Sequence, residues 1–190
     1  MTPPARTVPL ALALLTGGTA DAASHDLLAG LSADGVFRQT RPLPDDRVRR
    51  GERGYALLPD QFGGQWSVIL SGTPAANTVH FTFMGGRAAL TQGGPTIGKL
   101  MGRMVGRAAT TCFNVGTERL PDLRAWVEGA VRAGQDVTLD RRFGPLRAQL
   151  LVNRTDGDPD SPAGLAEVDV LLTRSGTPGT APWTNTCRAP

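Results

Sequence analysis

The chain has 190 residues, and its 24 glycines and 15 prolines together make up about a fifth of it, which exceeds average usage. Hydrophobic residues make up 40%, which is enough for one packed core and excludes collagen-like or wholly disordered chains. Aromatic residues make up 5%, so a nucleic-acid groove built on stacked rings is disfavoured and we expect no nucleic-acid partner. The net charge is +3, and 19 of the 20 basic residues are arginine.

Residues 1–22 have the features of a secretory signal peptide. Arg6 supplies a positive charge, residues 8–15 form a short apolar run, and Ala20-Asp21-Ala22 fits an A-x-A cleavage site. The apolar run is shorter than the roughly 20 residues that a membrane span needs, and no later segment approaches that length. We therefore expect cleavage after Ala22 and a soluble protein, secreted or periplasmic, without a transmembrane span. A buried N-terminal helix is the alternative.

Residues 23–60 are charged and interrupted by prolines, so we expect an irregular N-terminal segment with one brief helix at residues 27–31. A basic run in this segment contains Arg47, Arg49, Arg50 and Arg53. Such a run is a candidate for binding phosphate or a polyanion. Because three acidic residues between positions 45 and 52 nearly cancel its charge, we favour a solvated surface segment.

Two runs with period-two alternation predict an antiparallel hairpin in residues 65–84. The residues that share one face are Trp66, Val68 and Leu70 in the first run, and Val79, Phe81 and Phe83 in the second. A turn-rich segment at residues 72–76 joins the two runs. We expect this face to pack against the core and the other face to meet solvent.

A four-residue unit recurs in residues 96–110 and predicts a helix with a row of basic residues. The row consists of Lys99, Arg103 and Arg107, and a row of glycines (Gly98, Gly102 and Gly106) lies next to it. The apolar residues Ile97, Leu100, Met101, Met104 and Val105 fall on the opposite side.

Three interpretations of this helix are open. In the first, it lies on an anionic surface or offers Met101 and Met104 to a partner. In the second, which we favour, the glycines permit close packing, the apolar side joins the core and the basic row is solvated. The third is a phosphate loop formed by the preceding glycines, but no G-x-x-x-x-G-K-[ST] motif is present.

The clearest helix is predicted at residues 120–134, where apolar residues recur at helical spacing and Gly134 marks the end. Strand-like alternation follows at residues 137–141, 146–152 and 166–173. Short strands with one or two helices, without regular βαβ alternation, predict an α+β fold with a mainly antiparallel sheet. We expect a single domain at residues 61–190.

The two cysteines predict a disulfide bond. An exported chain meets an oxidising compartment, so we expect Cys112 and Cys187 to pair. The bond would tether the turn-rich tail, residues 175–190, to the domain. A catalytic or metal-binding cysteine is the alternative, but the sequence contains no Cys-x-x-Cys motif.

An acidic segment raises the question of a calcium site. The spacing of a calcium loop, with ligands at positions 1, 3, 5 and 12, is matched by Asp156, Asp158, Asp160 and Glu167. However, Ser161 occupies position 6, where such a loop needs glycine, and the flanking segments are predicted to be strands. We favour a proline-stiffened hairpin loop. A calcium site of millimolar affinity is the alternative, and we expect no other cofactor.

The sequence contains no recognisable catalytic motif. Its only histidines are His25 and His80, and we expect His80 to be a surface or partly buried residue on the polar side of its strand. We therefore predict an exported binding or interaction module for an unidentified protein or an anionic envelope component. Its expected contact surface consists of Lys99, Arg103, Arg107, Met101 and Met104. The alternative is a secreted hydrolase whose site is assembled from His80 and dispersed carboxylates.

Overall fold

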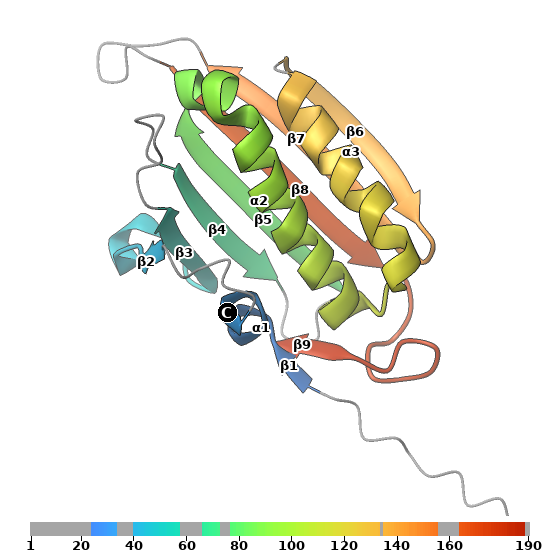
Figure 1. Cartoon of the computed structure of the whole chain (residues 1–190). Coiled ribbons are helices and arrows are strands. Elements are labelled where there is room, and N and C mark those ends of the chain that lie inside the picture. The colour runs from blue at the N-terminus through green and yellow to red at the C-terminus, as the bar shows by residue number, and fades with distance from the viewer. Residues whose placement is uncertain are drawn as a thin grey trace, which may run out of the picture.

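A seven-stranded antiparallel sheet organises the chain, as the computed structural model in Figure 1 shows. The structure describes residues 24–33, 40–57, 66–72, 77–133, 135–155 and 164–188, so the expected signal peptide lies outside it. The strands, in spatial order, are β2 (Thr40–Pro42), β3 (Glu52–Leu57), β4 (Trp66–Gly72), β5 (Thr78–Gly86), β8 (Leu165–Arg174), β7 (Leu146–Thr155) and β6 (Val137–Phe143). A second, parallel sheet pairs β1 (Ser24–Asp26) with β9 (Thr186–Arg188). The predicted single-domain α+β fold is confirmed.

Helices α2 (Arg87–Phe113) and α3 (Leu120–Ala133) lie on one face of the large sheet (Figure 1). Helix α1 (Leu27–Ala33) packs against α2 and next to β1. Two 3-10 turns are η1 (Asp45–Arg47) and η2 (Thr117–Arg119). Among the described helices, none is long and apolar enough to cross a membrane. The sheet face opposite α2 and α3 is called the open face below.

Side chains alternate between the two faces, as the period-two pattern predicts. The buried residues of the predicted hairpin are Trp66, Val68 and Leu70 on β4, and Val79, Phe81 and Phe83 on β5. Their antiparallel register places Val68 opposite Phe83. The Trp66 indole covers Gly85, where an added Cβ would lie 2.3 Å from the ring, so only glycine fits there.

The N-terminal segment departs from the prediction. The expectation of an irregular segment is wrong for residues 52–57, because β3 pairs with β4 along its whole length. Gly54 lies under the side chains of Leu43 and Val48, which cover part of the open face at this edge of the sheet. The brief helix expected at residues 27–31 is confirmed as α1, and its Leu27 and Leu31 are buried in the core.

Helix α2 is longer than the predicted helix and begins directly after β5. The glycine-rich stretch before Thr96 is therefore helical and does not form a phosphate loop. Pro95 lies inside the helix, where proline costs about 3 kcal/mol. Leu90 and Ile97, seven residues apart on one helical face, are both buried, and this burial offsets the cost.

The glycine row of α2 is the contact with α3. A Cβ added at Gly98 would lie 3.3 Å from the Glu128 Cα, and one added at Gly102 would lie 3.4 Å from the Arg124 carbonyl oxygen. The two backbones thus approach more closely than larger side chains would allow. The favoured interpretation of close packing is confirmed.

The apolar side of α2 faces the sheet, so the interpretation of Met101 and Met104 as partner contacts is wrong. Both side chains are fully buried in the core, together with Val105. Methionine fills irregular core space well. For the same reason these three side chains are not available to insert into a membrane surface.

The C-terminal tail is fixed to the end of α2. The predicted disulfide is confirmed between Cys112 on α2 and Cys187 on β9. Asn185 Nδ2 donates to the carbonyls of Thr111 (3.0 Å) and Thr110 (3.5 Å), and Trp183 Nε1 donates to the carbonyl of Cys112 (2.7 Å). The Arg174 guanidinium donates to the next carbonyl, that of Phe113. The last four carbonyls of α2, which have no partner within a helix, are therefore all bound by other parts of the chain.

We predict that Gly98→Leu lowers the free energy of unfolding by about 1–3 kcal/mol, because the new side chain must enter space held by the α3 backbone. The matched control is Gly129→Leu, since no atom beyond the adjoining helix backbone lies within 4 Å of a Cβ added at Gly129. It should raise stability by about 0.5–1 kcal/mol, because leucine favours the helix more than glycine does. Urea denaturation measures both, and equal effects would contradict the close packing.

We predict that Trp183→Phe lowers the free energy of unfolding by about 1–3 kcal/mol more than Trp126→Phe does. Both changes replace an indole by the smaller phenyl ring. Of the two tryptophans, Trp183 donates its indole N–H to a buried carbonyl. The indole of Trp126 instead packs edge-on against Phe143, with centroids 5.6 Å apart. Urea denaturation without reductant, which keeps the disulfide intact, measures the free energy of unfolding of both variants. If the two variants lose the same stability, the hydrogen bond from Trp183 to the Cys112 carbonyl contributes nothing.

Candidate functional site

The predicted basic row lines a groove between α2 and α3. The groove has a volume of about 410 Å³ and is lined by Thr96, Lys99, Arg103, Arg124 and Glu128. Two of the three predicted cations, Lys99 and Arg103, therefore line the groove. The third cation of the groove is Arg124 of α3, in place of the predicted Arg107. Arg107 is half-buried further along α2. The groove exists because the glycine row brings the helix axes together beneath these longer side chains.

The groove carries three cations and one acid. Lys99 and Arg103 are exposed, whereas Arg124 and Glu128 are half-buried. None of these four side chains forms an ion pair or hydrogen bond with another residue in the described part of the chain. The Arg124 Nε is buried without such a partner. The three cations therefore exceed the single carboxylate of Glu128 in this groove, and an anion would find donors on both helices.

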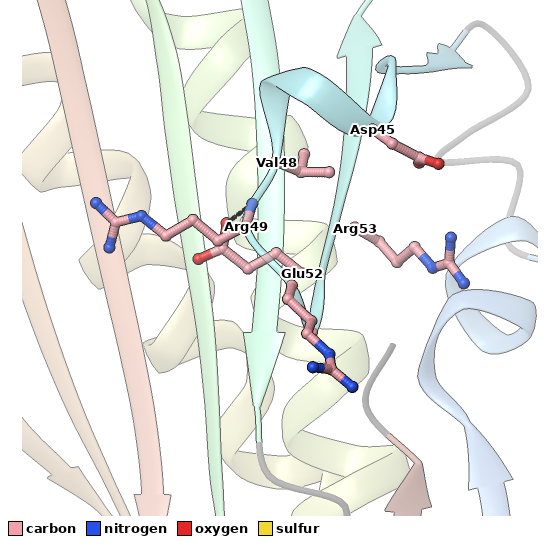
Figure 2. A pocket seen from close by; sticks show the side chains of 7 residues that line it. Asp45, Val48, Arg49, Glu52 and Arg53 are labelled. Atoms are coloured by element: carbon pink, nitrogen blue, oxygen red, sulfur yellow. Dashed lines mark hydrogen bonds between the residues drawn. The ribbon is translucent and has the colours of Figure 1, made fainter.

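The basic run at residues 47–53 forms a second, open pocket, of about 360 Å³. Figure 2 shows that the side chains of Arg49 and Arg53 point in opposite directions. Glu52 turns back to accept a hydrogen bond of 2.9 Å from the Arg49 backbone N–H. Because these two guanidinium groups diverge and two acids share the pocket, it offers weaker anion binding than the helix groove does.

The open face carries a polar cluster around His80. His80 Nε2 lies 2.8 Å from Asp169 Oδ1, and the Thr82 hydroxyl donates to the same oxygen at 2.7 Å. Glu167, the next residue on the same face of β8, interacts with Asp169, and this interaction raises the pKa of Glu167. The His80 side chain is 37% exposed and the Asp169 side chain 18%. The imidazole is thus held from one side and open to solvent.

The acids around His80 shift its titration. The hydrogen bond to Asp169 raises the pKa of His80 above 6.5 against the opposing effect of burial, and the charges of Glu52 and Glu167 add to the rise. Burial raises the pKa of Asp169, but hydrogen bonds from His80 and Thr82 outweigh it and leave that pKa lowered. Burial and the interaction with Asp169 raise the pKa of Glu167.

Sequence reasoning placed His80 correctly among polar neighbours but missed its partner. Asp169 lies 89 positions away and meets His80 because β5 pairs on its other side with β8, a strand distant in sequence. Alternation within residues 166–173 does place Asp169 on the polar face of its strand. However, no local sequence pattern predicts which strand lies next to this one in the sheet.

The proposed calcium residues are only partly described. Asp156, Asp158 and Asp160 lie outside the described residues. Glu167 belongs to β8, and its carboxyl group contacts Asp169 on the open face. Within the described ranges, no group of three or more His, Cys, Asp or Glu side chains is arranged to hold a metal ion.

Comparison with known proteins adds no further constraint. No family model, curated protein or solved structure matches the chain. The helix groove and the His80 cluster are therefore the two features from which a function can be inferred.

We predict that the coupling energy between His80 and Asp169 depends on pH. Because the folded pKa of His80 is raised, its stabilisation is complete below its ordinary pKa of 6.5 and is lost as pH rises through the folded value. Because the folded pKa of Asp169 is lowered, its share is lost in acid, below its ordinary pKa of 3.8. A double-mutant cycle with His80→Gln and Asp169→Asn should give about 0.2–1 kcal/mol at pH 5.5 and less at pH 8.5.

Proposed function

We propose that the chain is an exported binding module that holds a phosphate-bearing anionic ligand in the groove between α2 and α3. The observation that carries this proposal is the set of three cations, Lys99, Arg103 and Arg124, in one groove without an ion pair to another described residue. Ion pairing with nearby acids is the usual fate of clustered surface cations, and here Glu128 alone offsets them.

Phosphate is the anion that suits these donors. An arginine guanidinium offers a planar fork that matches two phosphate oxygens, and Lys99 adds a mobile point charge. Arg103 and Arg124 come from different helices, so a ligand in the groove contacts both walls. The buried Arg124 Nε has no described partner, so a ligand that reaches it would satisfy that donor as well.

A ligand within the groove suits the surface better than insertion into a bilayer does. The large apolar side chains that are exposed in the described residues are Leu151 and Leu165. Both belong to sheet strands, on the open face, and neither borders the helix groove. Among the described residues, the helix side therefore attracts anions by charge, without an exposed large apolar side chain beside the groove.

Export of the protein is supported by its disulfide bond. Cys112 and Cys187 are joined and buried, and such bonds persist in oxidising compartments. The signal-like features of residues 1–22 agree with this location. An envelope site would bring the module into contact with anionic polymers and lipid headgroups.

We predict that the double variant Lys99→Gln/Arg103→Gln binds inorganic polyphosphate about tenfold more weakly than the parent does at low salt. The slope of log affinity against log salt should fall by about 2, because two phosphate contacts are lost. Isothermal titration across a salt series measures both quantities. Parallel titrations with phosphatidylglycerol vesicles distinguish a headgroup from a soluble polymer.

The matched control is Arg141→Gln/Arg142→Gln, which removes the same charge from exposed positions on the edge strand β6. This control should retain both the affinity and most of the salt slope. If the two double variants weaken binding equally, the effect reflects overall charge and the groove is not the site.

A further inference from the structure

Three polar side chains occupy neighbouring positions across the open face, one on each of three adjacent strands. Ser71 on β4 is the direct partner of His80 on β5, and Glu52 on β3 is the direct partner of Ser71. Directly paired residues have Cβ atoms about 4.5–5.5 Å apart, so rotation of the Ser71 side chain brings its hydroxyl within reach of the imidazole. On the other side of His80 lies Asp169, bound to Nε2.

The contact with Asp169 determines which ring nitrogen is basic. A carboxylate accepts a hydrogen bond, so Nε2 carries the proton in the neutral ring and the lone pair is on Nδ1. Nδ1 forms no hydrogen bond with another described residue. The Thr82 hydroxyl donates to the same Asp169 oxygen and helps to fix it. A serine, a histidine and an orienting carboxylate are the three parts that an activated nucleophile needs.

We propose that the open face carries an acyl-transfer site, in which Ser71 is the nucleophile and His80 the general base, acting on small esters. This activity is independent of the anion groove, which lies on the opposite side of the sheet. Asp169 and Thr82 are positioning residues, because they act on the imidazole and not on the substrate.

In the reaction, Ser71 Oγ forms a bond to the ester carbonyl carbon while its proton passes to His80 Nδ1. The carbon–oxygen bond to the alcohol then breaks, and the alcohol leaves with that proton. A water molecule attacks the acyl group next and gives its proton to Nδ1. The carboxylic acid leaves as the proton returns to Ser71 Oγ, so enzyme and charge are restored.

The sheet limits the rate of this reaction. Backbone N–H groups of β4 and β5 are used in ladder hydrogen bonds, and this reduces the donors available for the developing oxyanion. We therefore expect slow turnover, so a single covalent labelling event is the more sensitive measurement. A fluorophosphate ester supplies this measurement, because Ser71 Oγ bonds to phosphorus, fluoride leaves with the electron pair and the proton goes to His80.

The test is to incubate the full chain with diisopropyl fluorophosphate and locate the adduct by peptide mass spectrometry. Ser67 is an internal control, because it lies on the same face of the same strand but opposite Met84. We expect the adduct on Ser71 and not on Ser67. Labelling should slow about 100-fold in His80→Gln, which loses the general base. No adduct at Ser71, or equal labelling of Ser67, overturns the proposal without recourse to any variant.

The pH profile tests the positioning role of Asp169. Labelling needs the neutral imidazole, so its rate should rise with pH through a midpoint above 6.5. Glu167 on β8 and Glu52 on β3 also raise this midpoint, but Asp169 contributes most. Asp169→Asn should therefore lower it. An unchanged midpoint would contradict that role, and labelling that persists in His80→Gln would overturn the proposed base.

Discussion

The end of helix α2 is the point on which the rest of the fold depends. This helix spans 27 residues across the sheet, and its last four carbonyls meet donors from Asn185, Trp183 and Arg174. Arg174 is buried and positively charged at the negative end of the helix dipole, with its guanidinium 5.0 Å from the Trp183 ring centre. The disulfide then holds the tail beside these carbonyls. The turn-rich tail is thereby an integral part of the core.

A second constraint, the glycine row of α2, connects packing with the proposed function. Glycine at Gly98 and Gly102 lets α3 approach, and that approach places Arg124 and Glu128 beside Lys99 and Arg103. The same residues that weaken helix propensity therefore create the groove. Propensity is a local quantity, whereas the gain from close packing arises only after both helices meet the sheet.

Local periodicity predicted much of this fold, and its failures have identifiable causes. The hairpin of β4 and β5, helix α3 and the three last sheet strands follow from patterns inside one segment, and the disulfide follows from there being two cysteines. The sequence did not reveal β3. The strand that pairs with β3 over its whole length is β4, which lies beyond a turn-rich stretch of the chain. It also left open whether Met101 faced a partner or the core. The meeting of His80 with Asp169 depends on strand order, which no local pattern encodes.

The pairing of β1 with β9 also determines when folding can finish. His25 lies opposite Cys187, so an early segment of the chain has its partner strand among residues 186–188. During synthesis, α2 emerges long before the donors that complete its last turn. Contacts between such distant segments form late and slow the folding of a chain. A nascent chain of this protein therefore cannot form the β1–β9 pair, or bind the last carbonyls of α2, until residues 183–188 have been synthesised.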